Sequence, residues 1–120
     1  MTRMQAWIAG VAVLGLCSVA NHEPVTAQVD KPCGDPARQK IAVTLVRRIN
    51  SIQANQFPRT QRYQPMTAFP ELSVPPGFVA QLVTNTSGSE YLLSVKDGQN
   101  PCGAAIFSDQ GGLIYVARPL

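Results

Sequence analysis

The chain has 120 residues, a formal net charge of +3, three cysteines and one histidine. This length allows one domain with a modest hydrophobic core and excludes a multidomain protein. A single histidine and few, scattered acids argue against histidine-based or paired-carboxylate catalysis.

The first 27 residues have the pattern of a secretory signal peptide. Arg3 is the only early basic residue, and the apolar run 6–20 that follows carries no charge. A membrane-spanning helix needs about 20 apolar residues, so this run is short for an anchor. We therefore predict an exported protein, periplasmic or extracellular, without a stable membrane span after cleavage.

The expected cleavage follows Ala27, because the segment 25–27 places small residues at the −3 and −1 positions. The alternatives are cleavage after Ala20, an uncleaved anchor, and a lipoprotein modified at Cys17. Leu16 is large for the residue that precedes a lipoprotein cysteine. The predicted organisation is a signal peptide (1–27), an N-terminal segment (28–35) and a single α+β domain (36–120).

The remaining cysteines, Cys33 and Cys102, each lie in a Pro-Cys-Gly triplet, which is typical of turns. Cleavage after Ala27 also removes His22 and Cys17. Two cysteines without a histidine are too few for zinc, and their separation does not fit a Cys-x-x-Cys redox motif. In a small exported protein they predict one structural disulfide, Cys33 to Cys102, and no metal site. A loop of this length would contribute about 4 kcal/mol of stability.

The pair Asp35-Pro36 is typical of a helix start, with Asp35 as N-cap and Pro36 at the first helical position. No glycine or proline follows until Pro58, so we predict a helix from 36 to about 56. Arg48 lies beside its apolar stripe and is expected to extend its charge outward. The predicted stripe comprises Ile41, Leu45, Ile49 and Ile52, flanked by Ala42 and Val46.

The segment between Pro58 and Gly77 combines five prolines with aromatic and apolar residues. Repeated prolines exclude a central strand and break helices. We predict a long ordered crossover with Tyr63, Phe69 and Leu72 tucked against the helix or sheet. Such loops are frequent binding sites, and the alternative is that these residues only cap the core.

Period-two patterns after Gly77 predict four strands joined by short turns. The segment 78–85 alternates around Val79 and Leu82, and 91–98, 104–109 and 113–119 follow. The predicted fold is therefore α+β: one N-terminal amphipathic helix packed on a four-stranded antiparallel meander sheet. Cys102 is expected to begin the third strand, so the disulfide would tie the helix start to the sheet.

Six basic residues and no acid lie between Arg38 and Arg62. They favour a solvated helix face over a ligand surface, and we expect no nucleic-acid partner because no aromatic stacking platform accompanies them. No phosphate-binding glycine loop is present, since Gly111-Gly112 joins two strands. We predict neither enzyme activity nor a cofactor, and no catalytic residue.

The segments "RRINSIQANQF", "PPGFVAQLV" and "AAIFSDQGGLIYVA" resemble the globular part of type IV pilins and pseudopilins. The resemblance spans roughly residues 36–118. A prepilin peptidase site, a Gly followed by Phe-Thr-Leu-x-Glu, is replaced by an ordinary signal peptide. The resemblance therefore implies a detached pilin-like domain that binds or assembles. The matching positions are Arg48, Ile49, Asn50, Ile52, Gln53, Gly77, Phe78, Phe107, Asp109, Gly112 and Ile114.

Two functions remain open at this point. One is an exported, disulfide-stapled pilin-like domain with a structural, adhesive or interaction role towards a protein or cell-surface partner. The other is an unrelated small periplasmic binding or inhibitor module that uses the loop 58–77. The candidate partner-binding residues are Arg59, Arg62, Tyr63 and Phe69; the sequence does not determine an oligomeric state.

Overall fold

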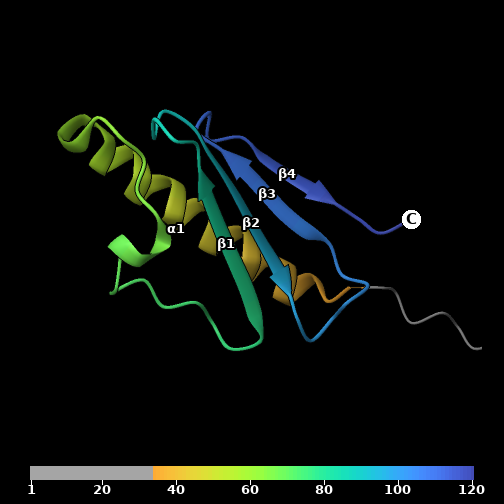
Figure 1. The fold of residues 1–120 in the computed structure, drawn as a ribbon. Coiled ribbons are helices and arrows are strands. Elements are labelled where there is room, and N and C mark those ends of the chain that lie inside the picture. The colour runs from red at the N-terminus through yellow and green to blue at the C-terminus, as the bar shows by residue number, and fades with distance from the viewer. Residues whose placement is uncertain (1–33) are drawn as a thin grey trace, which may run out of the picture.

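The computed structural model describes residues 34–120, so the predicted signal peptide, most of the N-terminal segment and Cys33 lie outside the described residues. One long helix packs on a sheet whose strands follow in chain order, β1-β2-β3-β4, each antiparallel to the next (Figure 1). This confirms the predicted meander and fold class. The elements are α1 (Pro36–Thr60), the short 3-10 helix η1 (Met66–Ala68), β1 (Phe78–Thr84), β2 (Tyr91–Asp97), β3 (Ala105–Asp109) and β4 (Ile114–Ala117).

Helix α1 begins as predicted but ends later than expected. Asp35 caps it by accepting a hydrogen bond from the N–H of Ala37 at 2.9 Å. The helix continues through Pro58 to Thr60, and Gln61 closes it in the left-handed region, with φ of 55° and its N–H bonded to Phe57 O. The side chains of Thr60 and Gln61 also donate to Gln56 O and Pro58 O, carbonyls of the last turn.

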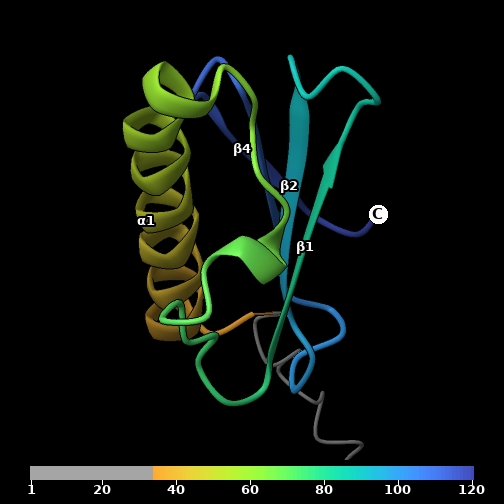
Figure 2. The same cartoon turned by 60° about the vertical axis from the view of Figure 1, so that its left-hand side comes forward.

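The core lies between α1 and one face of the sheet, mainly against β2 and β3 (Figure 2). The predicted apolar stripe is correct for most of its members, but Ile41 is 41% exposed and Gln53 takes a fully buried position instead. The core comprises Ala42, Leu45, Val46, Ile49, Phe78, Tyr91, Leu93, Val95 and Ile106.

The prediction for β1 was centred on Val79 and Leu82, and only Leu82 lies in the phase that faces the helix. Phe78, Ala80 and Leu82 pair with inward-facing residues of β2, whereas Val79 faces away from the helix and is 54% exposed. Both phases of this strand contain apolar residues, so alternation alone could not tell which one faces the helix.

The crossover between α1 and β1 is ordered against the core, as predicted. Phe69 is buried, and Tyr63 and Leu72 pack against the core cluster. The side chain of Gln53 holds the crossover from the helix: its amide N–H donates to Gln64 O, and its carbonyl accepts from Gln64 N–H at 3.0 Å. One helical side chain thereby replaces the backbone pairing that this irregular segment lacks.

Candidate interaction surface

The helix covers one face of the sheet, and within residues 34–120 no element covers the other (Figure 1). We call this surface the open sheet face and define it by Val79, Val83, Leu92, Phe107 and Tyr115. Val83 is 66% exposed and Leu92, its cross-strand partner, is 57% exposed. Phe107 pairs with Tyr115 across β3 and β4, so apolar residues occur on all four strands of this face. They alternate with polar residues, since Leu92 lies opposite Asp109, and Ser94 lies opposite Phe107. Exposed apolar side chains within a polar surrounding are a feature of protein contact sites.

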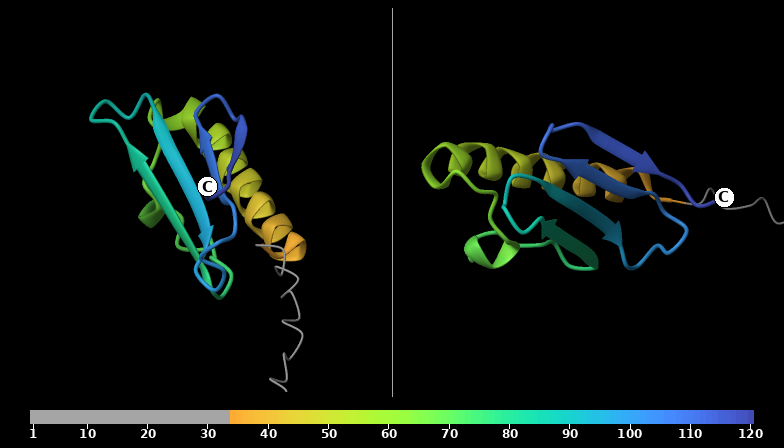
Figure 3. Two further views of the ribbon diagram at one scale, coloured as in Figure 1. Left: turned by 90° about the vertical axis from the view of Figure 1, so that its right-hand side faces the viewer. Right: turned by 45° about the horizontal axis from the view of Figure 1, so that its top comes forward.

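Strand β4 is the second exposed feature of the same region. It is the last strand of the sheet and pairs only with β3 (Figure 3), whereas α1 packs mainly on β2 and β3. Leu113, Tyr115 and Val116 are all about half exposed or more. An apolar edge strand with unpaired backbone groups can add a further strand from another chain.

The four residues predicted to bind a partner do not lie on one exposed surface. Phe69 is buried in the core, and Tyr63 is partly buried with its ring 4.5 Å from Phe57 and 4.8 Å from Tyr91, measured between centroids. Arg59 is exposed in the last turn of α1. Arg62 is exposed as well, but it takes part in a local contact described next.

The side chain of Arg62 attaches the start of the crossover to the β1–β2 turn. It donates to Thr86 O at 2.9 Å, and the N–H of the adjacent Tyr63 donates to Gly88 O at 2.8 Å. Gly88 has φ of 72°, and a Cβ there would lie 2.9 Å from Arg62 Nε. Arg62 and Tyr63 thus position this end of the molecule.

A chain of hydrogen bonds joins β2, α1, β3 and the turn before β4. Tyr91 donates its hydroxyl to Asn50 Oδ1 at 2.8 Å, Asn50 Nδ2 donates to Ser108 Oγ at 2.7 Å, and Ser108 donates to Leu113 O at 2.7 Å. Burial raises the pKa of Tyr91 to about 12, with smaller contributions from Tyr63 and Asp109. The groups satisfy one another, and within residues 34–120 the hydroxyl of Ser108 bonds to Asn50 and Leu113 and not to a histidine or a carboxylate that could activate it.

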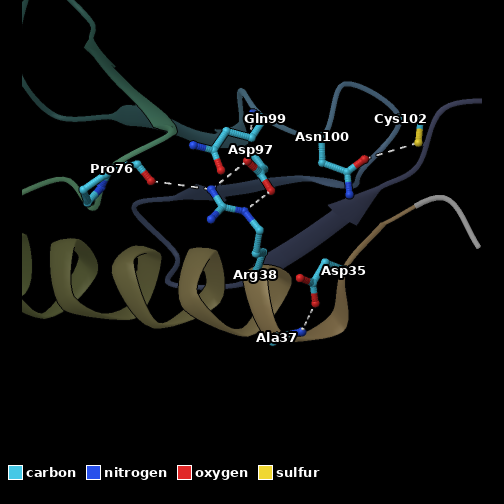
Figure 4. Close-up of polar contacts among 8 residues, drawn as sticks. All are labelled: Asp35, Ala37, Arg38, Pro76, Asp97, Gln99, Asn100 and Cys102. Carbon is cyan, nitrogen blue, oxygen red and sulfur yellow. Dashed lines mark hydrogen bonds and ion pairs between the residues drawn. The ribbon is translucent and has the colours of Figure 1, made fainter.

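At the opposite end, Arg38 forms an ion pair with Asp97 that ties the start of α1 to the end of β2 (Figure 4). The guanidinium carbon also lies 4.5 Å from the centre of the Phe78 ring. The hydrogen bond from Arg38, assisted by the N–H of Gln99, holds the pKa of Asp97 below its ordinary value. The sequence analysis did not predict this pairing, because its members lie 59 positions apart.

Most other basic side chains point into solvent. Within the described residues, Lys40, Arg47, Arg48 and Lys96 are exposed and make no ion pair, since Arg38–Asp97 is the single salt bridge found there. The prediction that Arg48 extends its charge outward is confirmed.

Cys102 lies in an exposed turn before β3 rather than at the first residue of that strand, and its Sγ is 3.3 Å from Asn100 Oδ1 (Figure 4). The predicted partner, Cys33, lies outside the described residues. A Cβ placed on Gly34 would be 3.9 Å from the Cα of Gly103, so the residues that follow the two cysteines are close neighbours.

Among residues 34–120, no cluster of three or more metal-ligating side chains occurs. Every buried side-chain nitrogen or oxygen in this part of the chain has a hydrogen-bond partner. None of the helices described there is both long and apolar enough to cross a membrane.

Comparison with protein-family models, with curated proteins and with solved structures found no match. The architecture, one N-terminal helix on a four-stranded antiparallel sheet, is loosely pilin-like. The open sheet face was missed by the sequence analysis, although a signal was present: β1 and β2 carry apolar residues in both phases of their alternation.

Proposed function

We propose that this chain is an exported, non-catalytic interaction domain of the pilin-like type, with a structural or adhesive role, that contacts a protein partner through the open sheet face and β4. The observation that carries the proposal is the combination of exposed apolar residues on the open sheet face with β4, an edge strand that is paired on one side only and carries the exposed Tyr115 and Val116. The two features offer a partner both side-chain contacts and backbone hydrogen bonds.

The pilin-like assignment is supported by the order of the elements and by the residues that carry the resemblance. Asn50 and Gln53 of the helix motif make hydrogen bonds that hold the sheet and the crossover. Asp109 of the last hairpin accepts from the N–H of Gly111 at 2.8 Å and so shapes the turn into β4. The motif residues are therefore those that maintain this architecture.

A photocrosslinking residue at Tyr115 tests the proposed surface in the native host, with Asn55 on the exposed part of α1 as the matched control. A discrete protein adduct from position 115, absent from position 55, is expected. Equal adducts from both positions, or none from 115, would refute the assignment of this surface.

The alternative module, which would bind through the loop 58–77, predicts a different result in the same experiment. Glu71 is exposed in this loop and provides the third crosslinking position. An adduct from 71 without one from 115 would favour the loop module. The burial of Phe69 and the local bond of Arg62 leave little of the predicted loop site available, which favours the sheet surface.

Export and the disulfide form the second part of the proposal. The close approach of Gly34 to Gly103 supports pairing of the adjacent Cys33 with Cys102, because a disulfide requires Cα atoms within about 7 Å. We expect the exported fraction to contain a species that begins near Gln28, is lighter by two hydrogens and has no free thiol, as measured by intact mass and thiol titration. A species that retains residues 1–27 or carries reduced cysteines would contradict this part.

A further inference from the structure

A groove runs along the N-terminal half of α1, between the helix and the crossover segment that leads into β1. It encloses about 470 Å³, which lies in the range of small-molecule sites. Its walls come from α1 on one side and from Ser73 and Pro75 on the other. Figure 2 shows the crossover returning beside this half of the helix.

Two parallel rows of helical residues line the groove. Ala37, Ile41 and Leu45 follow one another at four-residue spacing and form an apolar row. This row explains the exposure of Ile41, at 41%: its side chain faces the groove and not the core of the domain.

The second row is Lys40, Thr44 and Arg48, also at four-residue spacing. The Thr44 hydroxyl donates to Lys40 O at 2.9 Å, so its own hydrogen is already used within the helix. The two cations, about 12 Å apart along the helix axis, make no ion pair among the described residues. No acidic residue lines the groove, so its charge is purely positive beside an apolar row.

We propose that this groove binds a straight-chain carboxylate, with the carboxyl group on Arg48 and the alkyl chain along the apolar row. A guanidinium offers a carboxylate two parallel N–H donors, whereas the ammonium of Lys40 adds attraction as a point charge. The apolar row and Pro75 remove the chain from water. This inference does not depend on the proposed function, since the groove shares no residue with the open sheet face; its second wall, Ser73 and Pro75, belongs to the loop 58–77.

The test uses decanoate below its micelle concentration and the oxidised exported chain, followed by NMR chemical shifts. Shifts confined to residues 37–48 and 73–75 are expected. Octanoate, shorter by two methylenes, should bind on the order of tenfold more weakly. Decanol, which lacks the charge, should also bind more weakly than decanoate.

Variants separate this site from general attraction to a basic protein. Arg48→Gln should weaken decanoate binding about fivefold to tenfold, with no effect on decanol. Arg47→Gln is the matched control, because Arg47 is exposed on the same helix, outside the groove, and the change in net charge is identical. It should alter affinity by less than about twofold.

Four results would overturn the proposal: shifts outside the groove, no binding of decanoate, equal losses in the two arginine variants, or binding only to phosphatidylglycerol vesicles. The last result would indicate a membrane surface in place of a free carboxylate. Thermal unfolding of each variant, unchanged from the parent chain, excludes loss of fold as the cause.

Discussion

Replacement of Gln53 by Met should destabilise the domain although it places an apolar side chain of similar size in a fully buried position. Gln53 pairs both backbone groups of Gln64, and Met can pair neither. Leaving these two partly buried backbone groups without hydrogen-bond partners costs about 3 kcal/mol in total. Burial of the thioether offsets about 1 kcal/mol of this loss. The expected net loss is about 2 kcal/mol, or a Tm lower by about 8 to 16 °C for a domain of this size.

Urea unfolding and thermal unfolding measure this loss directly, and Gln56→Met is the control. Gln56 lies three residues further along α1 and is half-buried. Its side chain makes no hydrogen bond among the described residues. Its replacement should change stability by less than about 0.5 kcal/mol. The amide proton of Gln64 should also exchange faster in Gln53→Met, because its acceptor is gone.

Two outcomes would refute the reasoning: a Gln53→Met variant as stable as the parent chain, or equal losses in the two variants. Either would mean that the crossover is held by its apolar contacts alone, and that the pair of hydrogen bonds from Gln53 contributes no net stability.

Three further predictions concern pH and backbone conformation. The pKa of Asp97 is lowered from 3.8 by the hydrogen bond from Arg38, so the stabilisation is complete above that value and is lost as the pH falls through the folded-state pKa. In urea unfolding, the difference in unfolding free energy between the parent chain and Asp97→Asn should be constant from about pH 5 to 7 and should vanish in acid. A difference that persists in acid would contradict this. With its pKa raised from 10.0 to about 12, Tyr91 should ionise last in an absorbance titration, and Tyr91→Phe should lack that step. The stability linked to this raised pKa is fully present below pH 10 and is lost as the pH rises from there through about 12. Gly112→Ala should cost about 1 kcal/mol of stability, since φ is 74° and no atom lies within 4 Å of the new Cβ. Gly88→Ala should cost more, because its Cβ would displace the side chain of Arg62. Equal thermal stabilities of the two variants would argue against this.

The fold was largely predictable because its determinants are local. The cap at Asp35 acts on residues two positions away, and the turn at Asp109 is stabilised within the turn itself. Short turns between alternating segments leave the meander as the simplest arrangement of strands. The same local reasoning erred at Pro58, because side chains of the next residues complete the last turn there.

The candidate sites were less predictable. The four proposed contact residues were chosen because they lie in or beside a long ordered loop, a frequent place for binding sites, yet Phe69 is in the core and Arg62 bonds to a turn distant in sequence. The groove beside Arg48 requires the crossover to lie along the helix, and a helical pattern contains no information on that segment.

The sequence by itself determined the order of the elements, the start of α1 and the antiparallel meander, since caps, periodicity and glycine turns act over a few residues. The tertiary structure alone decided that Gln53 is buried, that Arg38 pairs with Asp97, and which phase of β1 faces the helix. These features join positions 11 to 59 residues apart or depend on which side of the sheet the helix occupies. Their energies come from packing and desolvation, which exist only once the layers have met.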